Sequence, residues 1–181
     1  MGIPSRLREL WQYRELIRNL VVRDLKVRYR NSLLGIVWSW ANPLLMMLVF
    51  TVVFNFLFTQ SGLSHYHVFL LCALLPWQFF AQSVTEATNS IVGNAHLIKK
   101  VYFPREVLPL SIILSNLVNF AIALPVFFGL AIVSGAPLTP WVLLLPVPIL
   151  VQVMFSLGIC LILSTLNVFY RDTRIILGGA M

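Results

Sequence analysis

Charged residues are scarce in this sequence of 181 residues. Asp, Glu, Lys and Arg together make up 10% of it, whereas a soluble domain carries about 25%. Hydrophobic residues make up 59%, and several apolar runs exceed the about 20 residues that cross a bilayer as a helix. The composition excludes an ordinary soluble domain. It predicts an all-α, polytopic transmembrane helical bundle.

Signatures of chemistry are missing as well. The sequence has no GxxxxGK[ST] loop, so we do not expect it to bind ATP by that route. It has no HExxH, CxxC or Ser–His–acid pattern, and Cys72 and Cys160 lie inside apolar runs, where a thiol usually behaves as a small hydrophobe. His65 and His67 lack further ligands nearby, so we expect no metal site. We therefore expect no enzyme activity, disulfide or cofactor on this chain.

The basic residues occur in three clusters, each beside an apolar run. Eight Lys and Arg precede the first run, three lie after the second and two lie after the fourth. The intervening turns at 59–67 and 135–140 have none. Because basic loops stay on the cytosolic side, this asymmetry predicts a cytosolic N-terminus, with the net charge of +7 explained by topology rather than by nucleic-acid binding. The first 30 residues are charged throughout, so we expect no cleavable signal peptide.

The apolar runs divide the chain into a cytosolic segment, 1–32, and a transmembrane domain, 33–181. The expected spans are 33–58, 68–92, 107–134, 141–168 and the start of a fifth from 175. Asn42-Pro43 lies inside the first span, where proline removes a backbone hydrogen bond and predicts a kink.

The segment 7–30 has the period of an amphipathic helix. Its polar residues recur at spacings of three and four: Arg8, Gln12, Glu15, Asn19, Arg23, Lys26 and Arg30. The opposite face carries Leu10, Tyr13, Leu16, Ile17, Leu20, Val21 and Leu25. We expect this helix to lie in the membrane interface, with a solvated leader held only by anionic lipid as the alternative.

A polar stripe marks the second half of the second span. Gln78, Gln82 and Glu86 follow one another at four-residue spacing, so they share one helix face. A charged side chain within a membrane is costly, so the stripe should face other helices or water, with Glu86 nearer the inner interface. Two interpretations stay open: hydrogen bonds between helices, or the lining of a transport path.

The loop between the second and third spans mixes charged and apolar residues. Asn94–Pro109 reads NAHLIKKVYFPREVLP. Apolar side chains on a short connector need a surface to pack against. We predict that this loop docks a water-soluble partner on the cytosolic side.

Four stretches, taken in order, carry a family resemblance. They are RDLKVRYRNSLLGIVW (Arg23–Trp38), NPLLMMLVF (Asn42–Phe50), LIKKVYFPREVLP (Leu97–Pro109) and LNVFYRDTR (Leu166–Arg174). With these stretches the chain resembles the membrane subunit of an ATP-binding-cassette exporter, the type 2 permease that moves O-antigen, teichoic acid or capsular polymers. Members of that family have a sixth span after the fifth, so the chain is expected to be a fragment or a truncated product.

The resemblance implies roles for particular residues. The cytosolic coupling loop 94–106 and the second connector would dock the ATPase through Leu97, Ile98, Lys99, Lys100, Val101, Tyr102, Phe103, Pro104, Arg105, Arg171 and Asp172. The resemblance assigns to the interfacial helix the residues Arg23, Lys26, Arg28, Tyr29 and Arg30. A polymer path would be lined by Phe50, Phe54, Phe79 and Phe80, beside Gln78, Gln82 and Glu86, with core packing or lipid contact as the alternative for the aromatic residues.

The resemblance also implies partners and a location. A separate ATPase subunit would bind ATP and Mg, and a second copy of the chain would complete the pore in the bacterial cytoplasmic membrane. The substrate would be a lipid-linked polysaccharide. Two other functions remain: a non-transporting membrane scaffold, and a membrane enzyme of cell-envelope glycan assembly. The enzyme would need clustered acids or histidines, whereas Glu86 is the only charged residue within the spans.

Overall fold

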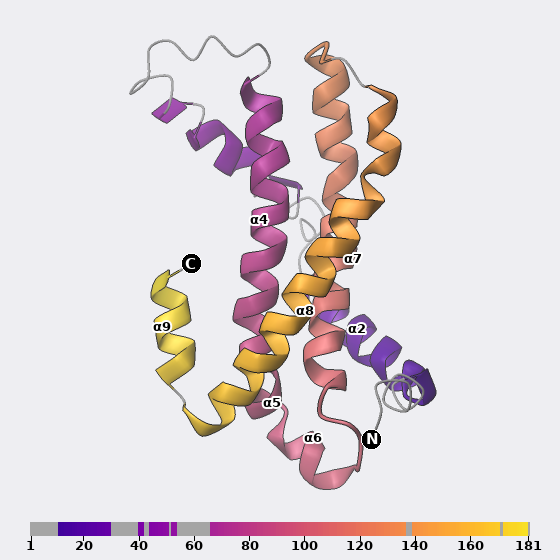
Figure 1. The fold of residues 1–181 in the computed structure, drawn as a ribbon, viewed down its shortest axis with the longest axis vertical. Helices are drawn as coiled ribbons and strands as arrows, with labels where there is room; N and C mark the ends of the chain where they lie inside the picture. Colours follow the sequence, from indigo (N-terminus) through magenta and orange to yellow (C-terminus); the bar gives the residue numbers. More distant parts are fainter. Residues whose placement is uncertain are drawn as a thin grey trace.

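A computed structural model describes residues 11–29, 40–41, 44–50, 52–53, 66–136, 139–170 and 172–180 of the chain. Its elements are α2 (Arg14–Tyr29), α4 (Tyr66–Thr88), α5 (Ser90–Gly93), α6 (Ala95–Lys100), α7 (Val107–Val133), the 3-10 helix η1 (Pro140–Leu144), α8 (Pro146–Phe169) and α9 (Asp172–Ala180). No strand occurs in these ranges, so the prediction of an all-α bundle is confirmed (Figure 1).

Among the described residues, three helices are long and apolar enough to cross a membrane. They occupy Val68–Thr88, Val107–Val133 and Pro140–Phe169, close to the second, third and fourth spans predicted from sequence. The long helices α4 and α7 run side by side along the molecule, and α8 packs obliquely across them (Figure 1). The chain is therefore a membrane protein whose described part has a core of three helices.

The first predicted span lies largely outside the described residues, including the expected kink at Asn42-Pro43 and the candidate Phe54. Its described pieces at 40–41, 44–50 and 52–53 are helical. The indole Nε1 of Trp40 donates a hydrogen bond of 2.8 Å to the backbone oxygen of Ile122. This bond places the start of the first span against the middle of α7.

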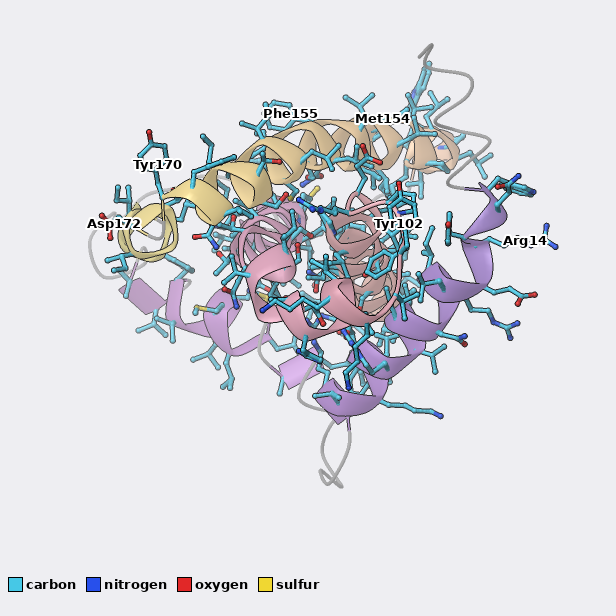
Figure 2. All side chains as sticks on the ribbon, turned by 90° about the horizontal axis from the view of Figure 1, so that it is seen from below. Arg14, Tyr102, Met154, Phe155, Tyr170 and Asp172 are labelled. Atoms are coloured by element: carbon cyan, nitrogen blue, oxygen red, sulfur yellow. The ribbon has the colours of Figure 1, made fainter. Side chains whose placement is uncertain are left out.

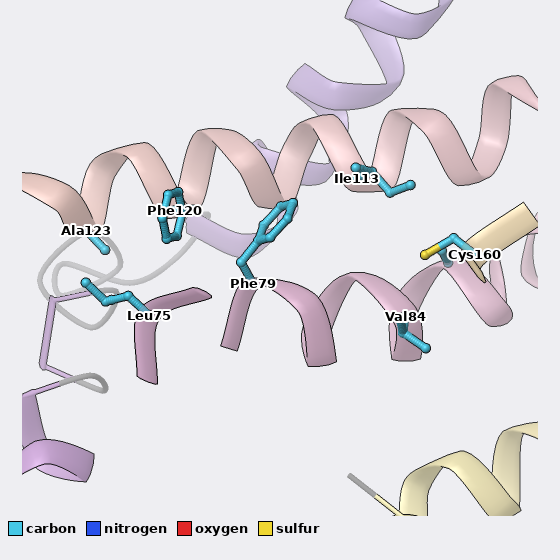
Figure 3. Close-up of a cluster of buried hydrophobic side chains, with 8 residues drawn as sticks. Leu75, Phe79, Val84, Ile113, Phe120, Ala123 and Cys160 are labelled. Atoms are coloured by element: carbon cyan, nitrogen blue, oxygen red, sulfur yellow. The ribbon is translucent and has the colours of Figure 1, made fainter. Parts of the chain in front are cut away.

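The hydrophobic core lies where α4, α7 and α8 meet. Phe79 of α4 and Phe120 of α7 face each other with ring centroids 5.7 Å apart (Figure 3). Around them are buried Leu75, Val84, Ala87, Ile113, Ala123 and Cys160. These apolar contacts hold the three helices together away from lipid.

Small residues let α8 approach α4 closely. Ser156, Cys160 and Ser164 recur at four-residue spacing on α8, and all three are fully buried. Lipid tails are as apolar as leucine, so helices in membranes associate through close packing and hydrogen bonds, and small side chains favour both. Asn167 adds such a bond, because its Nδ2 donates to the backbone oxygen of Thr88 at 3.0 Å.

We expect Cys160→Leu to destabilise the bundle by about 1–3 kcal/mol, because extra methyl groups overpack a closed interface. Thermal unfolding in detergent measures the effect. Cys72→Leu is the matched control, since the Cys72 side chain is exposed. Equal melting temperatures for the two variants would contradict the close α4–α8 contact.

The two ends of the bundle differ in charge. At the end that carries α5 and α6, the connector contains Lys99, Lys100 and Arg105. At the other end, α7 ends in a turn in which Gly135 adopts a φ of 67°, and Ala136 N donates to Ala131 O at 3.0 Å. A glycine with positive φ is a common helix stop. The basic residues of the connector between α6 and α7 therefore lie at one end of the described bundle, and the side of the membrane that this end faces stays a prediction.

Candidate functional site: a docking loop held by α2

The predicted docking loop consists of the short helix α6 and an irregular segment, 101–106, that leads into α7. Asn94 starts α6, since its backbone oxygen accepts from Leu97 N at 2.9 Å and Ile98 N at 3.2 Å. Val101 is extended, with φ −134° and ψ 133°, and ends the helix. A turn then begins α7, as Val107 N donates to Pro104 O at 3.1 Å. The loop therefore has a defined conformation between two helices.

One side of this loop is buried against α2. Phe103 is 6% exposed and forms a cluster with Leu20 of α2, which is 4% exposed. The rest of the cluster comprises Val107, Leu108, Tyr13, Leu16, Ile17, Leu97 and Ile98. The predicted amphipathic helix is therefore present, and part of its apolar face packs against the loop and the start of α7. Its location in the membrane interface stays a prediction.

The other side of the loop faces outward. Tyr102 is 92% exposed and Val101 is 54% exposed (Figure 2). Lys99, Lys100 and Arg105 are exposed as well. An exposed aromatic ring among cations, fixed on a buried base, is suited to enter a cleft of another protein. The sequence alone did not show which of the two adjacent aromatic residues, Tyr102 and Phe103, would be buried. The apolar face of α2 was nevertheless a signal that this helix could cover part of the loop.

The second predicted docking segment lies apart from the first. Asp172 begins α9 and is exposed, as is Tyr170 at 69%. Both lie well away from Tyr102 when the bundle is seen from below (Figure 2). Arg171 lies outside the described residues. The structure thus does not bring the two predicted docking segments together.

A charged cluster joins the end of α2 to α4 and α7. Arg28 Nη2 donates to Glu86 Oε1 at 2.7 Å and to Oε2 at 2.9 Å. Arg28 Nη1 donates to Asn116 Oδ1 at 2.9 Å, and Asn116 Nδ2 donates to Glu86 Oε2 at 3.1 Å. Each of the three side chains contacts the other two. The charge of Glu86, which is costly within a membrane helix, is thus compensated by α2.

Neighbouring residues extend this cluster. Tyr29 OH donates to Asn119 Oδ1 of α7 at 2.6 Å, and Gln82 Nε2 donates to Glu86 Oε1 at 3.2 Å. Gln78 and Gln82 line a small cavity of about 30 Å³ together with Asn116 and Asn119, enough for a bound water. The interpretation of the polar stripe as hydrogen bonds between helices thus describes Glu86, whereas Gln82 bonds to Glu86 within α4. A transport path along the stripe stays a prediction.

The residues predicted for the interfacial helix have different surroundings. Arg28 and Tyr29 reach into the bundle, as described above. Arg23 is exposed, pairs with Asp24 at 2.9 Å and donates to Asn94 Oδ1 at 3.3 Å. Lys26 is exposed, and Arg30 lies outside the described residues.

The aromatic candidates for a polymer path are also dispersed. Phe79 is 5% exposed in the helix core, where it packs on Phe120. Phe80 stacks on Phe155 of α8 at 5.8 Å. In this structure both rings pack between helices, and their part in a path stays a prediction, as does that of Phe50. No group of three or more metal-ligating side chains occurs among the described residues.

Comparison with known proteins identifies the family. The profile described as "ABC-2 type transporter" matches residues 15–181. The chain belongs to the ABC-2 type transporter family. Membership of this family confirms the resemblance to a type 2 permease. The exposed loop of this ABC-2 protein is therefore a candidate contact for the partner that such transporters need.

Relatives within the family have names that describe export. The chain is 39% identical over 175 residues to the O-antigen export system permease protein RfbA of Myxococcus xanthus, with 97% of this chain and 67% of that protein covered. Two RfbA proteins of Klebsiella pneumoniae are 41% and 40% identical over 159 residues, each with 87% of this chain and 61% of the relative covered. This ABC-2 chain therefore spans 61–67% of the length of these curated relatives.

Proposed function

We propose that the chain is the membrane-spanning permease subunit of an ATP-driven exporter of a lipid-linked cell-surface polysaccharide such as O-antigen. A separate ATPase would bind ATP and Mg, and the permease would carry out no covalent chemistry. The chain would lie in the bacterial cytoplasmic membrane with its N-terminus in the cytosol. Membership of the ABC-2 family and the names of the three relatives support this proposal.

The observation that carries the proposal is the division of the loop into a buried and an exposed side. Tyr102 and the two lysines are available to a partner, while Phe103 fixes the loop to α2. A partner that moves Tyr102 therefore moves α2 as well. Because Arg28 ties α2 to Glu86, the movement reaches α4 and α7 as a rigid-body shift.

A second copy of the chain would complete the path. The described part has three candidate spans, and their shared core is filled by side chains. A polymer path therefore requires further helices. We propose that a homodimer supplies them, with specificity arising from stacking and hydrogen bonds along the path.

Capture of the ATPase tests the docking role. We expect the triple variant Lys99→Ala, Lys100→Ala, Tyr102→Ala to lose most capture of the proposed partner ATPase, because it removes the exposed face and leaves the Phe103 anchor in place. A pull-down from membranes measures the captured fraction. Trp141→Ala is the matched control, since Trp141 is an aromatic residue, 74% exposed, at the other end of the bundle. Capture at the wild-type level by the triple variant would reject the docking role.

A further inference from the structure

A groove lies between the short helix α5, the start of α7 and the end of α8. Its volume is about 240 Å³, several times the ~30 Å³ that one water occupies in the liquid. Pro109, in the first turn of α7, and Phe169, the last residue of α8, both line it. Because α7 and α8 are candidate spans, the groove lies where the hydrocarbon core of a membrane gives way to the headgroups.

Most of the groove wall is apolar. Ile91 belongs to α5, Pro109 to α7, and Leu161, Val168 and Phe169 to α8. Val168 is 45% exposed and Phe169 is 74% exposed, so the described side chains leave part of this wall open. An open apolar wall at the end of two spans is a surface that an acyl chain can cover.

The two hydroxyl groups in the wall already have partners within α8. Ser164 Oγ donates to the backbone oxygen of Leu161 at 3.1 Å, and Thr165 Oγ1 donates to the same oxygen at 2.8 Å. A hydroxyl bonded back to its own helix leaves its donor occupied. The α8 side of the groove therefore suits hydrocarbon better than a ligand that must form hydrogen bonds.

A cation without a partner among the described residues also lines the groove. The Arg105 side chain is exposed and makes no hydrogen bond or ion pair with the described protein. A guanidinium can bind two phosphate oxygens through parallel hydrogen bonds, and basic pockets between spans bind phospholipid headgroups. Lys99 and Lys100 belong to the same connector but do not line the groove, so the surroundings of Arg105 differ from theirs.

Glu106 lines the groove next to Arg105 and limits the charge that a headgroup can carry. Its carboxylate repels further negative charge near the guanidinium. A phosphate monoester carries about −1.5 to −2 charges at pH 7, whereas a phosphodiester carries a single negative charge. The groove therefore favours a lipid with one phosphodiester over a lipid with a monoester or a diphosphate.

We propose that this groove binds one membrane phospholipid, with its phosphodiester on the Arg105 guanidinium and an acyl chain along Leu161, Val168 and Phe169. The occupant is a lipid of the surrounding bilayer, so the proposal does not depend on the export function. The bound lipid joins the end of α8 to the connector that precedes α7.

Lipid binding to the purified, delipidated full-length permease tests the proposal. Native mass spectrometry in detergent measures the Kd of the tightest site for dioleoylphosphatidylcholine. We expect dioleoylglycerol, which has the same chains without the phosphate, to bind about tenfold more weakly, the equivalent of one lost charge-assisted hydrogen bond. Glycerophosphocholine, which has the headgroup without the chains, should not bind. Farnesyl diphosphate, a lipid with a more highly charged headgroup, should not displace the phospholipid.

Two pairs of variants assign the binding to this groove. Arg105→Gln should raise the Kd for dioleoylphosphatidylcholine about tenfold and remove its advantage over dioleoylglycerol. Lys100→Gln is the control, because it removes a cation of the same connector that lies outside the groove. Thr165→Phe should raise the Kd as well, because its ring fills the groove. Leu166→Phe is the control, since Leu166 is also exposed on α8 but does not line the groove.

All four variants should melt like wild type, because each replaces an exposed side chain. The comparison of the lipids on the wild type needs no variant. The proposal is overturned if dioleoylglycerol binds as tightly as the phospholipid, if either groove variant binds like its control, or if farnesyl diphosphate displaces the phospholipid. The assay contains no ATPase, so the ATPase pull-down and the lipid titration can each fail without the other.

Discussion

Phe103→Ala is expected to destabilise the docking loop by about 3–5 kcal/mol, the usual cost of removing a buried phenyl ring. The ring of Phe103 is 6% exposed and packs on Leu20 and the start of α7. Without it, α2 and the loop lose their main shared contact. Hydrogen exchange of the amides of residues 95–107 measures the change, and these amides should exchange faster while those of α8 stay protected.

Tyr102→Ala is the matched control for this prediction. The two aromatic residues are adjacent, but Tyr102 is 92% exposed, so its loss should leave hydrogen exchange unchanged. Under the proposed function, Tyr102→Ala instead weakens capture of the ATPase. Equal protection of the loop in the wild type and in Phe103→Ala would show that α2 does not hold it.

Removal of the ion pair between Arg28 and Glu86 should have the second largest effect on the free energy of unfolding. A double-mutant cycle of Arg28→Ala and Glu86→Ala is expected to give a coupling energy of about 1–3 kcal/mol. Either single variant leaves a partly buried charge without its partner, whereas the double variant removes both. The two side chains retain 24% and 37% exposure, so the coupling is smaller than for a fully buried pair. Unfolding by denaturant in detergent supplies the free energies.

The exposed pair on the same helix provides the comparison. A cycle of Arg23→Ala and Asp24→Ala should give a coupling energy below about 1 kcal/mol, because water screens such pairs. The side chain of Arg23 is 46% exposed and that of Asp24 is 25% exposed. If both cycles gave the same coupling energy, the Arg28–Glu86 pair would have no special part in attaching α2 to the bundle.

The sequence predicted the long helices well because membrane spans depend on local composition. The runs at 68–92, 107–134 and 141–168 lie close to the helical segments that end at Thr88, Val133 and Phe169. The second run differs at its end, where its last residues belong to the separate short helix α5, Ser90–Gly93. Its polar residues, Asn89 and Ser90, mark that break.

Contacts between distant residues were harder to predict. The stripe that includes Glu86 indicated that this charge needed a partner, but Arg28 lies 58 positions away along the chain. Local periodicity placed Arg28 on an interfacial helix among other basic residues, and spacing alone could not identify the one that turns inward. Phe103 and Tyr102 posed the same problem, because only the position of α2 decides which ring is covered.

The two contacts that attach α2 to the bundle also restrict the number of residues that can lie between them. Leu20 contacts the loop and Arg28 contacts Glu86, and the separation of eight positions between them corresponds to a little over two helical turns. Inserting or deleting one residue between them would rotate one attachment by about 100° relative to the other. Relatives that keep both contacts must therefore keep this spacing, even where every other residue of the helix has changed.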